Sequence, residues 1–210
     1  MKLYDLKEDY FDIINTNNKA YWLGLLLSDG TIYKNNSSYT LGLTLLNEDS
    51  YLLSLLLNEI NSDSKINIIN NKYSNIKICN KRICESLISH GVVENKSMIV
   101  KLPNVDETLL PHLIRGIFDG DGTISISKNK NANTYRSRVK IVSGSPYLIN
   151  SLHDVFTLWG VSSYKYFDKR GKGCHEVYIT KKEDVKNFYK IIYENANIFM
   201  HRKKNKFINV

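Results

Sequence analysis

The chain has 210 residues, which is enough for one or two domains with a substantial apolar core. Its 29 Lys and Arg residues outnumber its 21 Asp and Glu residues, and the formal net charge of +8 favours a polyanionic partner such as nucleic acid. No apolar run is long enough to span a bilayer, and the N-terminal residues carry early acids without the apolar stretch of a signal peptide. We therefore expect an intracellular protein that is neither secreted nor membrane-bound.

The three cysteines are Cys79, Cys84 and Cys174, and no two of them form a Cys-x-x-Cys pair. An odd, widely spaced set of this kind indicates neither a disulfide framework nor a zinc site. We interpret these cysteines as ordinary thiols.

In chain order, the first half is predicted to contain a helix, two strands, a helix, two strands and a helix. An apolar helix follows an N-cap at Thr16 or Asn17. Hydrophobic periodicity then predicts the remaining elements, which are strands at 31–34 and 39–45, a helix at 49–60, strands at 65–69 and 75–79, and a helix at 82–90.

The second half repeats this order. The predicted elements after its apolar helix are strands at 123–128 and 135–142, a helix at 146–158, strands at 164–168 and 176–180, and a helix at 184–195. Alternation along the first two strands places Ile124, Ile126, Val139 and Ile141 toward the helices, and Ser125, Ser127, Arg138 and Lys140 on the opposite face. We predict an α+β fold of two pseudo-symmetric αββαββα repeats, at residues 1–102 and 103–210.

One short pattern occurs in both halves. The apolar runs at residues 20–32 and 113–124 both end in Asp-Gly-Thr-Ile. Each run has small residues four positions apart, Gly24 with Ser28 and Gly116 with Gly120, so we expect the two helices to pack closely along a seam of these four residues. The glycine after each acid is typical of a helix C-cap.

The acids at the ends of these runs, Asp29 and Asp121, stand at unfavourable positions. A carboxylate at the carbonyl end of a helix costs roughly 0.3 to 1 kcal/mol, and two helices packed side by side would also bring the two acids together. A divalent cation removes both problems. Carboxylate, backbone carbonyl and water are the oxygen ligands that Mg²⁺, Ca²⁺ and Mn²⁺ prefer.

At residues 22–30 and 114–122 the chain resembles the LAGLIDADG homing endonucleases in their two-motif, single-chain form, and the resemblance extends over residues 11–102 and 103–208. The first motif departs from the family pattern at Leu27 and Ser28. The resemblance implies motif helices at the centre of the molecule, two sheets that form a DNA-binding saddle, and catalytic metal-binding roles for Asp29 and Asp121. Asp119 corresponds to a less essential flanking residue.

The resemblance also implies the rest of the site. Carbonyl oxygens near Ser28 and Gly120 would complete the coordination of Mg²⁺, with Mn²⁺ or Ca²⁺ as substitutes, and the ions would assist hydrolysis of one phosphodiester bond in each DNA strand. Lys96 and Lys203 align with the family's basic residue near the reacting phosphate. The alternative interpretation is that each is a surface lysine that caps the end of a helix. Asn47 and Ser143 align with its polar water-ordering position.

The polar faces of the two sheets are the expected DNA-binding surface, because Arg and Lys can pair with guanine or phosphate. The candidate DNA contacts are Tyr33, Lys34, Lys65, Lys72, Lys77, Ser125, Ser127, Lys128, Lys130, Tyr135, Arg136, Arg138, Lys140, Lys169, Arg170 and Lys172. Residues 123–210 carry 17 basic and 6 acidic residues, a net charge of +11, whereas residues 1–122 carry −3. We expect a monomer on a long, asymmetric double-stranded site, anchored mainly by its second half.

Four other hypotheses remain beside a homing endonuclease. The same fold could serve a nucleic-acid-binding maturase or regulator that does not cleave, although both acids are intact. An intein-embedded enzyme is disfavoured because splicing blocks are not recognisable, so an intron-encoded or freestanding enzyme is expected. A binding domain whose Asp-Gly pairs are only turns would need no metal, and a homodimer is disfavoured because one chain holds both motifs. Abundant Asn, Lys, Ile and Tyr fit an A+T-rich genome of a phage, bacterium or organelle.

Overall fold

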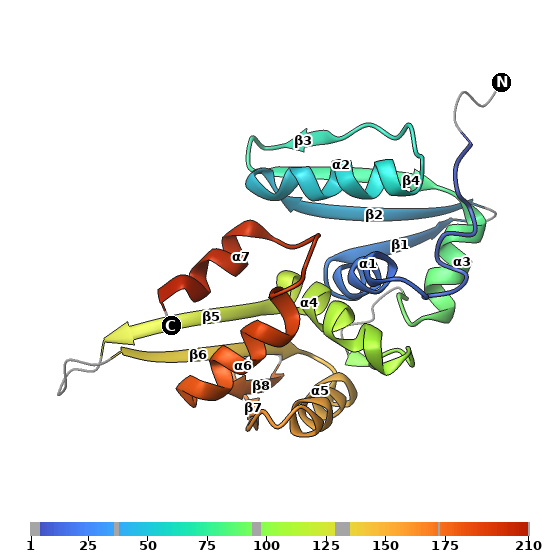
Figure 1. The fold of residues 1–210 in the computed structure, drawn as a ribbon. Helices are drawn as coiled ribbons and strands as arrows, with labels where there is room; N and C mark the ends of the chain where they lie inside the picture. The colour runs from blue at the N-terminus through green and yellow to red at the C-terminus, as the bar shows by residue number, and fades with distance from the viewer. Residues whose placement is uncertain (1–4, 36–37, 94–97, 129–134, 172, 210) are drawn as a thin grey trace. The chain divides into compact units, whose positions relative to one another are not determined.

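The structure is a computed structural model that describes residues 5–35, 38–93, 98–128, 135–171 and 173–209. Tertiary contacts divide the chain into two compact units, one of Met1–Glu94 with Val105–Ile117 and the other of Asn95–Asn104 with Phe118–Val210. Each unit contains a four-stranded antiparallel sheet covered by helices (Figure 1). The described residues therefore form an α+β fold, as predicted.

The first unit has the predicted order of elements. They are α1 (Asn17–Ser28), β1 (Gly30–Asn35), β2 (Ser38–Leu46), the 3₁₀ turn η1 (Asn47–Asp49), α2 (Ser50–Glu59), β3 (Asn67–Ile69), β4 (Tyr73–Cys79) and α3 (Lys81–Ser89). Thr16 is the N-cap of α1, and its hydroxyl accepts a hydrogen bond from the Lys19 amide at 3.3 Å. The strand order is β1-β2-β4-β3, and α2 and α3 contact the sheet at β2.

Helix α1 is the centre of the first unit's core. All residues from Ala20 to Leu27 are buried, so α1 is apolar on every side rather than amphipathic. The last eight residues of this unit, Leu110–Ile117, belong to helix α4 and pack against α1.

The second unit takes up the chain at the end of α4 and repeats the topology. Its elements after η3 (Glu107–Leu109) and α4 (Leu110–Asp121) are β5 (Gly122–Lys128), β6 (Tyr135–Ser143), α5 (Pro146–Leu158), β7 (Tyr164–Asp168), β8 (Cys174–Ile179), α6 (Lys182–Tyr193), α7 (His201–Asn205) and η4 (Lys206–Asn209). The strand order is β5-β6-β8-β7, the counterpart of the order in the first unit. Helices α5 and α6 cover this sheet.

The predicted alternation on β5 and β6 is confirmed. Ile124, Val139 and Ile141 are buried, whereas Ser125 and Arg138 are exposed. Ile126 and Lys140 are half-buried. The exposed Ser125 and Arg138 consequently share one face of the sheet, opposite the helices.

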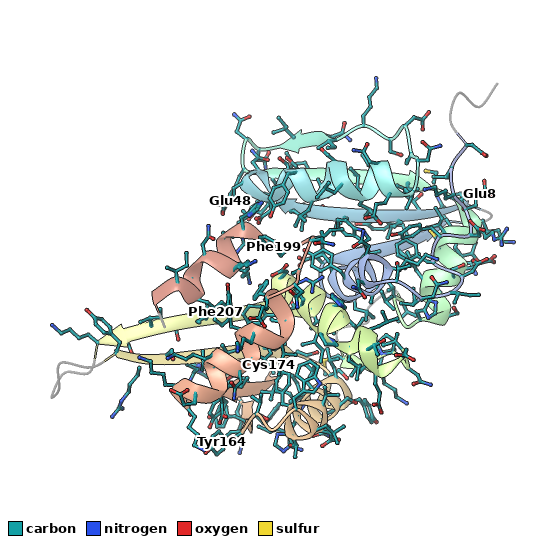
Figure 2. The ribbon with its side chains drawn as sticks, in the orientation of Figure 1. Glu8, Glu48, Tyr164, Cys174, Phe199 and Phe207 are labelled. Carbon is teal, nitrogen blue, oxygen red and sulfur yellow. The ribbon has the colours of Figure 1, made fainter. Side chains whose placement is uncertain are left out.

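Helix α7 was not predicted, because His201–Asn205 is short and has no apolar periodicity. It is held by the aromatic residues on either side of it. The rings of Phe199 and Phe207, both labelled in Figure 2, lie with their centroids 6.3 Å and 5.8 Å from that of Tyr193. None of the helices in the described part of the chain has the length and apolar character needed to cross a bilayer.

Candidate active site

Asp29 lies at the C-terminal end of α1. Its amide still donates to the Leu25 carbonyl at 2.9 Å, and β1 begins at the next residue, Gly30. The Asp29 side chain is half-buried. Because unpaired carbonyl groups collect at this end of a helix, the carboxylate stands in a field of its own sign.

Asp121 occupies the corresponding place in the second unit. It is the last residue of α4, its side chain is exposed, and β5 begins at Gly122. Gly30 lies opposite Leu43 in the β1–β2 pair, and Gly122 lies opposite Ile141 in the β5–β6 pair. Each acid thus joins a motif helix to the first strand of its sheet.

The glycines after the two acids are typical of helix C-caps, but neither adopts the positive φ for which a cap of this kind needs glycine. Positive φ angles occur among the described glycines at Gly91, Gly160, Gly171 and Gly173, and at neither motif glycine. The motif glycines are required for space instead. A Cβ on Gly30 would lie 2.6 Å from the Leu26 carbonyl oxygen, and one on Gly122 would overlap Phe118, because each strand turns back sharply over the helix before it.

The predicted contact between the motif helices is present within the first unit. A Cβ on Gly24 would overlap the Leu113 carbonyl and lie 3.0 Å from the Ile117 nitrogen. A Cβ on Gly116 would overlap the Tyr21 carbonyl and lie 2.6 Å from the Leu25 nitrogen. The two backbones therefore touch at Gly24 and Gly116, and we call this contact the helix seam.

Ser28 extends the seam toward the end of α1. Its hydroxyl lies 3.3 Å from both the Gly24 and the Ile117 carbonyl oxygens, so it links α1 to α4. Gly120, predicted as the fourth seam residue, belongs to the second unit, where its carbonyl oxygen lies 3.5 Å from the Lys203 ammonium. Its part in the seam stays a prediction.

The Lys203 side chain lies at the C-terminal end of α4. This side chain is buried, with 7% exposure, and its ammonium donates to the Gly122 carbonyl as well as approaching that of Gly120. These two carbonyl groups lie on either side of Asp121 in the chain. A cation beside them offsets the negative charge at the C-terminal end of α4. Lys203 is consequently not the surface lysine of the alternative interpretation. Lys96, its predicted counterpart, lies outside the described residues.

Asp119 is more than a flanking residue. It is fully buried, and its two carboxylate oxygens accept hydrogen bonds from the Tyr193 hydroxyl and, at 2.7 Å, from the Met200 amide. Buried carboxylates require partners of this kind. The sequence signal was the acid itself, two residues before Asp121 in an otherwise apolar helix.

The two residues predicted to order water both accept hydrogen bonds within their own units. The Asn47 amide oxygen accepts from the Ser74 hydroxyl at 2.8 Å, and the Ser143 hydroxyl accepts from the Ser145 amide at 3.1 Å. These bonds stabilise the turns that follow β2 and β6.

The outer face of the second sheet forms a polar hollow of about 570 Å³. Its lining consists of Ser125, Ser127, Arg136, Ser137, Arg138 and Thr180. The Arg138 guanidinium lies over the Tyr178 ring, 4.6 Å from its centroid, and Tyr178 in turn stacks on Tyr164 at 5.5 Å. A cation–π contact of this kind restrains the Arg138 side chain, which stays exposed.

Two other residues of this unit that were predicted to contact DNA form ion pairs with acidic side chains. Lys140 forms an ion pair with the buried Glu176 at 2.9 Å, and Arg170 forks onto Asp168 with its shortest contact at 2.6 Å. The Arg170 guanidinium lowers the pKa of the Asp168 carboxyl from 3.8 to about 2. Lys140 and Arg170 are therefore partly neutralised within the protein, in contrast to Arg138.

The remaining predicted contacts of the second unit lie at the sheet margin. Lys128 and Tyr135 pair with each other at the end of the β5–β6 hairpin, on the face opposite that of Arg138. Lys169 is exposed, and Lys130 and Lys172 lie outside the described residues.

The predicted contacts of the first unit are all exposed but do not share one face. Tyr33 lies on the outer face of β1, whereas Lys34 follows on the other face with its ammonium over Tyr39. Lys77 is on the outer face, paired with Gly42. Lys65 precedes β3 and Lys72 precedes β4, so both lie in the connections of the sheet.

Two family profiles match separate parts of the chain. Residues 18–91 match one described as the WhiA LAGLIDADG-like domain, and residues 111–193 match one described as a LAGLIDADG-like domain. No curated protein matches the chain in sequence.

Solved LAGLIDADG endonucleases share the fold at low identity. The homing endonuclease I-GzeII in complex with its DNA target is 14% identical with a TM-score of 0.66, over 89% of this chain and 86% of that one. The meganuclease I-AabMI bound to uncleaved DNA is 12% identical with a TM-score of 0.65, over 90% and 88%. The homing endonuclease I-LtrWI bound to target DNA is 14% identical with a TM-score of 0.62, over 95% and 88%.

The repeated fold and the repeated motif define the class of LAGLIDADG proteins. Both copies are contained in one polypeptide, and each is matched by a LAGLIDADG-like family profile. The chain belongs to the two-motif, single-chain LAGLIDADG proteins.

Proposed function

We propose that this protein is a site-specific DNA endonuclease of the homing type, which makes double-strand breaks with the help of a divalent cation. The observation that carries the proposal is the matched position of Asp29 and Asp121, each at the junction of a motif helix and the first strand of its sheet. Carboxylates at helix C-termini are unfavourable unless a cation accompanies them.

The donors fit a hard cation such as Mg²⁺. The carboxylates of Asp29 and Asp121, with backbone carbonyls at Ser28 and Gly120, would hold it, and Mn²⁺ or Ca²⁺ would suit the same oxygen ligands. Such an ion supplies Lewis-acid activation of water and neutralises charge on the phosphate. Within the first unit, the Ser28 hydroxyl, next to Asp29 in the chain, lies 3.3 Å from the Ile117 carbonyl oxygen of α4. The related I-SmaMI was solved on uncleaved DNA with calcium ions.

In this proposal Lys203 stabilises the negative charge that develops on the phosphate. Its buried ammonium is fixed beside Asp121 by the carbonyl groups at the end of α4, which is the preorganised arrangement that favours electrostatic catalysis. Lys96 would do the same for the first repeat. Asn47 and Ser143 would bind water through their side-chain donors, since the hydrogen bonds that they make within the protein use only acceptor oxygens.

The outer sheet faces would bind the DNA. Arg136 and Arg138 line a polar hollow, and Arg138 is restrained by Tyr178 without an acidic partner among the described ion pairs. The related I-GzeII and I-LtrWI structures contain DNA targets. One chain with two unlike halves would act as a monomer on a long, asymmetric site, and a DNA substrate implies an intracellular location.

The second candidate is a nucleic-acid-binding regulator or maturase of the same fold that does not cleave. The match of residues 18–91 to the WhiA LAGLIDADG-like domain favours it, because the fold family includes non-cleaving members. The two candidates differ in metal dependence. Only the endonuclease needs a divalent cation for its activity.

The test is selection of cleaved sites from a randomised DNA library with Mg²⁺, beside a matched reaction in EDTA. We expect a single long consensus among molecules cut only with Mg²⁺. Recovery of bound but uncut DNA with a clear consensus would support the non-cleaving regulator. Absence of both binding and cutting would contradict an endonuclease and a DNA-binding regulator.

A further inference from the structure

We infer that Asp119 is a positioning residue for Lys203. Cleavage of one DNA strand then depends on the hydrogen-bonded attachment that Asp119 makes, and cleavage of the other strand does not. This inference rests on the proposed function. Its structural part, the attachment of α7 to α4, can be tested without any cleavage.

Asp119 joins three helices through one carboxylate. It projects from α4, and its partners are Tyr193, the last residue of α6, and the backbone amide of Met200, the residue before α7. The Asp119 and Tyr193 side chains and Met200 are all fully buried. A buried carboxylate hydrogen-bonded by a backbone amide fixes that amide strongly, because either group would be costly to leave unpaired.

Lys203 lies one helical turn beyond Met200 and returns to the same end of α4. Its ammonium donates to the Gly122 carbonyl, three residues after Asp119, and lies 3.5 Å from that of Gly120. The Met200 carbonyl also accepts a hydrogen bond from the Lys203 amide at 3.0 Å, and this bond fixes the turn of backbone that joins the two residues. The start of α7 and its lysine are therefore both held by residues on either side of Asp121.

The described residues of the first repeat show no equivalent of this attachment. The position that corresponds to Asp119 is Leu27, a buried side chain that accepts no hydrogen bond. Leu27 instead lies against Gly91, at the start of the segment that leads to Lys96: a Cβ built on Gly91 would be 3.9 Å from the Leu27 Cδ2. Among the residues that the structure describes, a carboxylate at this motif position makes the attachment in the second repeat, and Leu27 cannot make it in the first.

The experiment measures the two strands separately under single-turnover conditions, on a duplex with a different label on each strand, for Asp119→Asn and Asp119→Leu. Asp119→Asn keeps an acceptor oxygen, whereas Asp119→Leu copies the first repeat. Lys203→Met identifies the strand that uses Lys203. Asp184→Asn, a change at another buried acid of the same unit, is the matched control.

We expect Asp119→Leu to slow that same strand roughly 10-fold or more, since a misplacement of about 1 Å is enough for such a loss. The Asn variant should be intermediate, and the rate on the other strand and the DNA affinity in Ca²⁺ should change less than about 3-fold. In a protein that already carries Lys203→Met, adding Asp119→Leu should slow the strand no further. Hydrogen exchange should show faster exchange at Met200 and in α7. Asp184→Asn should leave the ratio of the two strand rates unchanged.

A purely structural role would slow both strands equally, in proportion to the decrease in folded protein, and that result would overturn the inference. So would unchanged hydrogen exchange in α7. If the wild-type protein cuts no DNA with Mg²⁺, the proposed function fails by itself, and the exchange measurement still decides whether Asp119 holds α7.

Discussion

Substitution of Gly116 tests the helix seam most severely. A Cβ there would lie 2.6 Å from the Leu25 nitrogen, at least 0.8 Å short of the 3.4 Å at which ordinary van der Waals contact begins, and it would overlap the Tyr21 carbonyl. Both obstacles are backbone atoms of a buried helix, so neither can rotate aside. The helices must separate, and tight packing along α1 is disrupted.

The expected magnitude follows from two opposing terms. Alanine is favoured over glycine inside a helix by about 1 kcal/mol, so an unobstructed Gly116→Ala would stabilise the protein. Overpacking of a core costs typically 1 to 3 kcal/mol. We expect Gly116→Ala to lose stability despite its better helix propensity, and Gly116→Leu to lose roughly 3 kcal/mol or more.

Urea denaturation gives the free energy of unfolding for each variant. Ser54→Leu places the same leucine side chain on the exposed face of α2 and should stay within about 0.5 kcal/mol of the wild type. Because Gly24 and Gly116 occupy one crossing, the double alanine variant should lose less than the sum of the single losses, by about 0.5 kcal/mol or more. Stable Gly116 variants, or strict additivity, would refute the seam.

Two further predictions concern charge. Replacing Arg136 and Arg138 by Gln should flatten the salt dependence of non-specific DNA binding, by roughly 0.9 in log-log slope for each phosphate that is no longer neutralised. Arg170→Gln should flatten this slope less, because Asp168 already offsets the Arg170 charge. Neutralising Lys34, Lys65, Lys72 and Lys77 together should also flatten it less, and equal slopes for these three variants would contradict the prediction. Burial and then Arg115, which donates to its Nδ1, lower the pKa of His112 from 6.5 to about 4. Between these pH values the unfolded chain binds more protons, so this group makes stability rise with pH, and His112→Asn should flatten the rise of unfolding free energy measured from pH 4 to 6.5.

The order of elements could be predicted because each hydrophobic pattern agrees with the local chain signals. Strands β5 and β6 show clear alternation, and helix α5 was predicted with its observed bounds because Pro146 opens it and Gly160 follows its end. Close packing at Gly24 and Gly116 was readable from the spacing of small residues alone.

The rest depends on tertiary contacts that no local pattern encodes. Helix α7 exists because Asp119 and an aromatic cluster hold both of its ends, although its own sequence favours no structure. The motif glycines looked like caps, but their small size is what the chain reversal requires. The neutralisation of Arg170 by Asp168 depends on the conformation of a turn, so composition alone overestimates this turn as a DNA anchor.

The most direct test of the central claim is double-strand cleavage of the selected target with Mg²⁺ by Asp29→Asn and Asp121→Asn. Asparagine keeps the size and one oxygen of the side chain but removes the charge that a divalent cation requires. We predict that each variant alone loses double-strand cleavage while its DNA affinity in Ca²⁺ stays close to that of the wild type. Double-strand cleavage at the wild-type rate by either variant would contradict a site built from both acids.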